Sequence, residues 1–216
     1  MKKAVIFDLD GTLIDSLEDI AINANITLKK LGCPTHPIDK YKNFVGDGAK
    51  VLIENAMPKY IAQKYRDQGL SLFKELYEEN LHTHTKLYDG IQLLLEELKS
   101  LNIPCAILSN KPDKFTKLYV EKLLSKISFI DVVGQKEGVP KKPNPIAALD
   151  IAKKLQLDTK DIYFVGDTAT DMKTAKNANM RAVGVSWGFR GVYELRDNGA
   201  EFILNKPNDL LNHLSM

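Results

Sequence analysis

The chain has 216 residues, of which 44% are hydrophobic and 27% charged, and its formal net charge is +2. This composition is typical of a globular protein with a sizeable core, and the small net charge without a concentrated basic face argues against nucleic-acid binding. Cys33 and Cys105 lie far apart, which argues against a disulfide framework or a zinc site. The apolar runs are too short to span a bilayer, so we expect a cytoplasmic protein with no membrane partner.

The first apolar run, residues 4–7, leads directly into Asp8 and Asp10. A short, nearly continuous apolar run is typical of a strand buried on both faces of a parallel sheet. Two neighbouring carboxylates at the end of such a strand repel each other and need a cation or strong hydrogen-bond donors. A turn would explain Asp10-Gly11 but leaves Asp8 unexplained, so the pair favours a functional site.

Residues 16–85 contain helical patterns without a convincing strand. Ser16 is expected to cap the first helix, with Asp19 in its first turn. We therefore predict an all-helical domain over residues 16–85, inserted into a core of residues 1–15 and 86–216. Gly46 and Gly48 precede another helical pattern that contains Lys50, and backbone amides at that helix start could meet an anionic substrate. A plain interhelical turn explains these glycines equally well.

The rest of the chain alternates short apolar runs with amphipathic stretches. The runs begin near residues 103, 129, 162, 182 and 202. This alternation predicts an α/β fold with a doubly wound parallel sheet and a Rossmann-like core. In such a sheet, ligands bind beyond the carboxyl ends of the strands, so polar residues at those ends are candidates for the site.

Polar side chains follow three of these runs. Ser109 and Asn110 end one run, Lys142 precedes a proline-rich turn, and Asp167 and Asp171 follow the run that starts near residue 162. Taken singly, most have ordinary explanations as loop, surface or helix-start residues. Asp167 is the exception, because a carboxylate directly after a buried strand is unusual.

Together these segments resemble the haloacid dehalogenase superfamily of phosphohydrolases. "DLDGT", Ser109, the Lys142 of "KKPNP" and "GDTATD" stand in the order of its four motifs, and the helical insert resembles its cap domain. Ser109 and Thr168 replace the commoner threonine and serine, but both keep a hydroxyl. Asp10 argues against the dehalogenases themselves, which lack this second aspartate. The segments "FVGDGAKVLIENAM" and "KPNPIAAL" resemble the phosphoglycolate phosphatase group within the family.

The resemblance implies a role for each motif residue. Asp8 attacks phosphorus and forms an aspartyl-phosphate, while Asp10 protonates the leaving group and later activates water. Thr12 is expected to orient Asp10. Ser109 and Lys142 are expected to contact the phosphoryl group, with Lys142 also restraining Asp8.

The resemblance also implies a Mg²⁺ site and a substrate site. Mg²⁺ would be bound by the side chains of Asp8 and Asp167 and by the backbone carbonyl of Asp10, with Asp171 a water-mediated partner. The predicted substrate-binding residues are Ser109, Asn110, Lys142, Gly46, Gly48 and Lys50.

The function predicted from the resemblance is Mg²⁺-dependent hydrolysis of a small phosphorylated metabolite, with 2-phosphoglycolate the first candidate. Pyrophosphate, nucleotides, sugar phosphates and a phosphoglucose mutase reaction stay open as alternatives. A phospho-receiver signalling module uses a similar acidic cluster. However, it lacks a helical insert, and its acceptor aspartate ends a later strand. The sequence leaves both monomer and homodimer open.

Overall fold

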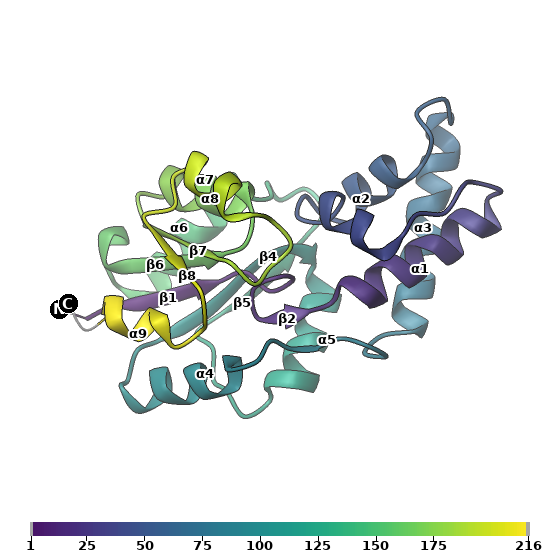
Figure 1. Cartoon of the computed structure of the whole chain (residues 1–216). Coiled ribbons are helices and arrows are strands. Elements are labelled where there is room, and N and C mark those ends of the chain that lie inside the picture. The colour runs from purple at the N-terminus through teal and green to yellow at the C-terminus, as the bar shows by residue number, and fades with distance from the viewer. Residues whose placement is uncertain (1, 215–216) are drawn as a thin grey trace.

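A six-stranded parallel sheet forms the centre of the computed structural model, which describes residues 2–214 (Figure 1). Its strand order is β5-β4-β1-β6-β7-β8. The strands are β1 (Ala4–Phe7), β4 (Cys105–Pro112), β5 (Val132–Gln135), β6 (Ile162–Gly166), β7 (Arg181–Val185) and β8 (Phe202–Leu204). This arrangement confirms the predicted α/β class, and it places β1 between β4 and β6.

The alternation of side chains along β1 gives the sheet two buried faces. Val5 and Phe7 belong to one hydrophobic cluster, whereas Ala4 and Ile6 belong to the other. Helices α4 (Ile91–Ser100), α5 (Asp113–Leu124) and α9 (Asp209–Leu214) cover the first face. Helices α6 (Ile146–Leu155), α7 (Ala169–Asn177) and α8 (Val192–Asp197) cover the second, and a short 3-10 turn, η2 (Thr159–Asp161), precedes β6. Since both faces are covered, the strands read as continuous apolar runs.

A helical lobe lies at one end of the sheet (Figure 1). We use this name for α1 (Leu17–Lys30), η1 (Ile38–Asn43), α2 (Ala49–Ala56) and α3 (Gln63–Glu79). At Gly69 of α3, an added Cβ would come within 3.1 Å of Met57 Sδ, so the glycine allows α3 to pack closely beside α2. The domain boundaries at residues 15/16 and 85/86 stay predictions. Across residues 2–214, no helix is both long enough and apolar enough to cross a membrane.

Two short strands that the sequence did not predict join the helical lobe to the sheet. β2 (Ile14–Asp15) and β3 (Lys86–Leu87) pair antiparallel, with Ile14 opposite Leu87 and Asp15 opposite Lys86. The chain therefore leaves and re-enters the core at adjacent points.

The start of α1 differs from the prediction. Ser16 occupies the N-cap position, but its side chain makes no capping hydrogen bond. Its hydroxyl instead donates to Oδ1 of Asp10 (2.5 Å). Asp19, in the first turn, accepts hydrogen bonds from the backbone N–H groups of His84 (2.9 Å) and Thr85 (3.0 Å). These bonds fasten the returning chain to α1.

Candidate active site

Asp8 directly follows β1 at the carboxyl edge of the sheet. Its backbone N–H donates to the carbonyl of Val165 (2.9 Å), which extends the pairing with β6 by one residue. The carboxylate is buried, and its Oδ1 lies 2.9 Å from Nζ of Lys142. Burial raises the pKa of Asp8 to about 6 against the opposing pull of Lys142, and repulsion from Asp171 adds to the rise.

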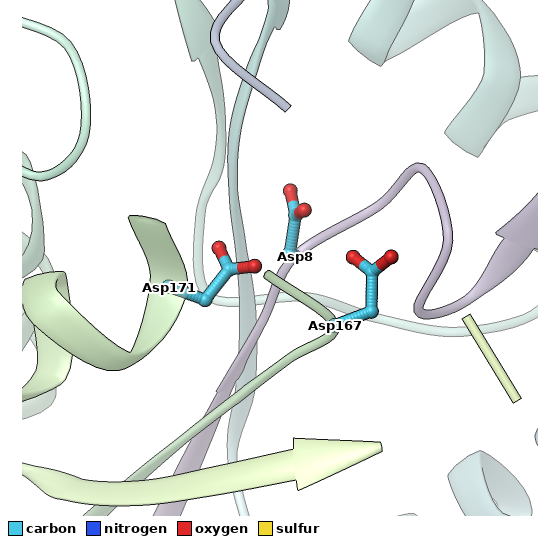
Figure 2. Close-up of side chains that lie close together, drawn as sticks. All are labelled: Asp8, Asp167 and Asp171. Atoms are coloured by element: carbon cyan, nitrogen blue, oxygen red, sulfur yellow. The ribbon is translucent and has the colours of Figure 1, made fainter. Parts of the chain in front are cut away.

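Asp167 and Asp171 complete an acidic cluster with Asp8, in which one carboxylate oxygen of each residue lies within 4.8 Å of the others (Figure 2). Asp167 follows β6 and accepts a hydrogen bond from the backbone N–H of Phe189 (2.8 Å). Asp171 lies in the first turn of α7 and accepts from the N–H and hydroxyl of Thr168 (3.0 and 2.7 Å). Burial, together with repulsion from Asp171 and Asp8, raises the pKa of Asp167 well above its usual range.

Two glycines make room for these carboxylates. A Cβ on Gly11 would lie 2.3 Å from Oδ2 of Asp167, and Gly11 also has a φ of +82°. A Cβ on Gly166 would lie 2.3 Å from the Asp171 side chain. The glycine of "DGT" therefore does more than form a turn, because it lets the backbone approach Asp167 closely.

Lys142 is the cation of the acidic cluster. Its buried ammonium lies 2.9 Å from Asp8 and donates to Oδ1 of Asp171 (2.6 Å). Burial alone would lower the pKa of Lys142, but Asp171 and Asp8 more than offset this effect, so the pKa is raised and the side chain stays charged. Asn110 holds the lysine backbone: it accepts from the N–H of Lys142 (2.9 Å) and donates to its carbonyl (3.1 Å).

The acidic cluster suits a divalent metal ion. Three buried carboxylates face one ammonium, which leaves an excess of two negative charges when all three are ionised. Oδ1 of Asp8 is buried and has no hydrogen-bond partner, although it lies close to Lys142. An all-oxygen donor set with unbalanced negative charge is typical of hard cations such as Mg²⁺. The residues present therefore fit the metal.

Asp10 is not one of the three residues of the acidic cluster, and it lines a cavity that Asp8 also lines. Its carboxylate accepts hydrogen bonds from Ser16 (2.5 Å) and from Lys111 (3.0 and 3.1 Å). The expectation that Thr12 orients Asp10 is wrong, since the Thr12 hydroxyl lies 3.5 Å from Oδ1 of Asp167. The turn after β1 directs Thr12 toward β6 and leaves Ser16 to hold Asp10.

The cavity has a volume of about 50 Å³ and lies between the carboxyl edge of the sheet and the helical lobe. From the core it is lined by Asp8, Asp10, Ser109, Asn110 and Lys111, among others. From the helical lobe it is lined mainly by apolar side chains, together with Gly46, Gly48 and Tyr77. The structure thus brings most of the predicted site residues to one place.

Residues 45–48, which we call the docked segment, are held against the core by four side chains. Carbonyl oxygens of the segment accept from Asn110 (Gly46 O, 3.0 Å), Arg190 (Val45 O, 2.9 Å) and Lys141 (Asp47 O, 2.5 Å), and Thr170 donates to the Asp47 carboxylate (2.9 Å). Asn110 is therefore a positioning residue for both Lys142 and the docked segment.

Lys50 does not join the docked segment at the cavity. Its side chain is 64% exposed and pairs with Glu54 (3.9 Å), so the structure does not support a direct substrate contact. Sequence reasoning, in turn, missed Lys111, Ser16 and Arg190. Lys111 directly follows the Ser109-Asn110 pair at a strand end, and this position was the available signal.

The sequence model of the haloacid dehalogenase-like hydrolase family matches residues 5–185 of this chain. That span includes the acidic cluster and the helical lobe. The chain is 32% identical over 215 residues to a phosphoglycolate phosphatase of Vibrio parahaemolyticus, covering 97% of this chain and 94% of the relative. It is 33% identical over 210 residues to a phosphoglycolate phosphatase of Aquifex aeolicus, covering 97% and 95%.

The fold is also similar to that of a solved structure, a predicted phosphoglycolate phosphatase from Haemophilus somnus. The TM-score is 0.91 at 28% sequence identity, and the match covers 98% of this chain and 97% of the other. The likeness thus includes the helical lobe as well as the sheet.

Proposed function

The chain belongs to the haloacid dehalogenase-like hydrolase family, and on that premise we propose that it is a Mg²⁺-dependent phosphatase of small phosphate monoesters, above all 2-phosphoglycolate. The proposal rests on one observation: the buried Asp8 carboxylate lies at the end of the central strand, beside Lys142 and the two other residues of the acidic cluster. Membership of a hydrolase family argues against the phospho-receiver alternative.

Asp8 is the proposed nucleophile. Its carboxylate oxygen attacks phosphorus, the bond to the ester oxygen breaks, and the phosphoryl group is left on Asp8 until water hydrolyses it. Dividing the reaction into two displacements lowers a barrier that is very high for uncatalysed phosphate monoesters. The buried strand end supports this role, because the surrounding sheet fixes the direction of attack.

The side chains of Asp8 and Asp167 and the carbonyl of Asp10 would hold Mg²⁺, with Asp171 acting through water. When bound, Mg²⁺ supplies positive charge that offsets the carboxylates and the phosphoryl oxygens. Lys142 keeps its charge in the buried site and restrains Asp8, so it contributes the same kind of electrostatic stabilisation from the protein. Ser109 is buried within β4 and would donate to a phosphoryl oxygen.

Asp10 is the proposed general acid and base. Its carboxyl group gives a proton to the leaving oxygen in the first step and takes one from the attacking water in the second. Ser16 and Lys111 hold its oxygens at the cavity wall, which fixes the position of the carboxyl group for proton transfer.

Two observations favour a small substrate. A cavity of about 50 Å³ has room for only a few water molecules, since one water needs roughly 10–15 Å³ measured in this way. The curated relatives from Vibrio and Aquifex carry the name phosphoglycolate phosphatase. Nucleotides and sugar phosphates would need the helical lobe to move much further from the core.

The proposal is tested by measuring kcat/KM for a panel of phosphate esters with Mg²⁺ and with a chelator. The panel contains 2-phosphoglycolate, pyrophosphate, nucleoside monophosphates and hexose phosphates. We expect turnover only with Mg²⁺ and the highest value for 2-phosphoglycolate. A higher value for another ester would replace the substrate assignment, and absence of Mg²⁺-dependent turnover on every ester would reject the phosphatase function.

A further inference from the structure

Lys111 is a buried cation that the proposed chemical steps do not require as a reacting group. It lies in β4, two residues after Ser109, and its side chain is only 4% exposed. A lysine side chain is seldom buried this completely unless it is paired, because removing the ammonium from water is costly. Its position next to the phosphoryl-binding strand end therefore calls for a functional explanation.

Both parts of the molecule hold the ammonium of Lys111. From the core, the Asp10 carboxylate accepts two contacts at 3.0 and 3.1 Å. From the helical lobe, the hydroxyl of Tyr77 accepts at 2.8 Å, and Tyr77 is itself bonded to Tyr119 of α5 (3.0 Å). The ammonium lies 4.7 Å from the ring centres of both tyrosines. Contacts of this kind fix the position of the charge at the cavity wall.

Tyr77 does not pair with Lys111 as an anion. Burial, reinforced by the nearby Asp10, raises the pKa of Tyr77 well above its usual range, so the phenol stays neutral. Tyr119 is fully buried and presents its ring to the same ammonium. Asp10 is therefore the carboxylate that pairs with Lys111 among the described residues.

Lys111 differs in charge from the other residues that line the cavity. Among the lining residues of this cavity, all within the described chain, Lys111 is the sole cation, whereas Asp8 and Asp10 are acidic and most of the others are apolar. A phosphoryl group attacked by Asp8 would lie at the acidic end, near Ser109. A second anionic group a few bonds away would face either apolar side chains or Lys111, and only Lys111 could compensate its charge.

We propose that Lys111 binds a second anionic group of the substrate and thereby selects acidic phosphate esters over neutral ones. In 2-phosphoglycolate this group is the carboxylate, so the inference rests on the proposed function and names the residue that recognises this substrate class. An ammonium has three N–H donors. Asp10 and the Tyr77 hydroxyl already accept from these donors, so a substrate carboxylate entering the cavity would pair with the ammonium by sharing or replacing one of these contacts.

The first test uses the unaltered protein with Mg²⁺ and two non-hydrolysable ligands of nearly equal size. In 3-phosphonopropionate a methylene replaces the ester oxygen of 2-phosphoglycolate, and in 3-hydroxypropylphosphonate a hydroxymethyl group also replaces the carboxylate. Calorimetry should show binding of the first at least tenfold tighter, which is the ratio expected for one charge-assisted contact. Equal affinities would overturn the proposal without any variant being made.

The second test compares variants by the ratio of kcat/KM for 2-phosphoglycolate to that for 2-hydroxyethyl phosphate, a neutral analogue. Lys111→Gln removes the charge but keeps a hydrogen-bond donor toward Asp10, and Lys111→Met removes both. The matched control is Lys126→Met, at an exposed position just after α5. Thermal melting establishes that each variant is folded.

We expect the ratio to fall at least tenfold in Lys111→Gln and Lys111→Met and to stay unchanged in Lys126→Met. A fall in both activities with a constant ratio would mean that Lys111 acts only through Asp10, and the proposal would be wrong. The two proposals fail differently. If the unaltered enzyme hydrolyses phosphate esters but does not favour acidic ones, the selectivity of Lys111 is rejected and the phosphatase chemistry stands.

Discussion

The acidic cluster and the docked segment face the same cavity but are positioned in different ways. Asp8 and Asp167 each follow a buried strand, so the pairing of β1 with β6 brings them together. The docked segment comes from the helical lobe and is held by side chains from several separate parts of the core. The chemistry is thus built into the sheet, whereas the fit around the substrate depends on where the helical lobe lies.

The largest effect on turnover is expected for a substitution in the acidic cluster. Asp8→Asn keeps the shape of the side chain but removes the proposed nucleophile, so kcat should fall on the order of 10⁴-fold or more for every ester. Steady-state turnover is the measurement. Asp39→Asn, at a side chain that is 88% exposed, is the matched control and should behave as the unaltered protein. Substantial turnover by pure, folded Asp8→Asn would remove Asp8 from this role.

A smaller effect on kcat/KM is expected for the two neighbouring lysines, and it should differ between them. Lys142 is buried between Asp8 and Asp171, whereas the side chain of Lys141 is exposed and donates to the carbonyl of Asp47. Lys142→Ala should lower kcat/KM by roughly 100-fold or more. Lys141→Ala should cost less than about tenfold, or ~1.4 kcal/mol. Equal losses would mean that the docked segment matters as much to catalysis as the acidic cluster does.

A substitution in the docked segment is expected to change substrate selectivity. Gly48 has a φ of +87°, and an added Cβ would lie 3.1 Å from the carbonyl of Asn110. Gly48→Ala should therefore displace the docked segment and change the ratio of kcat/KM for 2-phosphoglycolate to that for p-nitrophenyl phosphate about tenfold. Lys50→Ala, which alters an exposed side chain, should leave the ratio within about threefold. If the two variants changed the ratio equally, the docked segment would not determine selectivity.

The smallest effect concerns stability. Folding raises the pKa of Asp8 to about 6 from an ordinary value near 3.8, and it also raises the pKa of Asp167 well above its usual range. The folded protein thus holds these protons more tightly than the unfolded chain. In the metal-free protein, the contribution of Asp8 to stability is greatest below about pH 4 and is lost as the pH rises to about 6.

In the proposed site Mg²⁺ would bind the ionised carboxylates, so it should raise Tm by a few degrees more at pH 7.5 than at pH 5. Melting curves with Mg²⁺ and with a chelator at both pH values provide the measurement. Asp167→Ala should reduce the difference, and a Mg²⁺ effect equal at both pH values would contradict the assignment of the metal to this cluster.

The sequence was sufficient for the fold and for the acidic cluster because the signals are local. Each strand appears as a short apolar run, and Asp8 and Asp167 stand directly after two of them. A parallel sheet brings such positions to one edge, so no long-range information was needed to expect them together. The position of Lys142 came from the family resemblance, and the structure places its ammonium between Asp8 and Asp171.

The contacts around Asp10 could not be predicted in the same way. Thr12 and Ser16 are both hydroxyl residues near Asp10 in sequence, and only the path of the turn decides which one reaches it. Lys111 lies near the end of β4, but its proposed role depends on Tyr77, which lies 34 residues away on another part of the molecule. Pairings of this kind are set by how the helical lobe packs on the core, which no local pattern encodes.

The pairing of β2 with β3 also bears on how such an enzyme could acquire new substrates. Because Ile14 lies opposite Leu87, the two ends of the intervening chain are already held side by side by the core. A different insert could therefore replace the helical lobe at this point without changing the distance between β1 and α4. The cost of closing a longer loop grows only slowly with its length, so the junction tolerates inserts of different sizes. Recombination at residues 15 and 86 would then be a route to new specificity that leaves the catalytic carboxylates untouched.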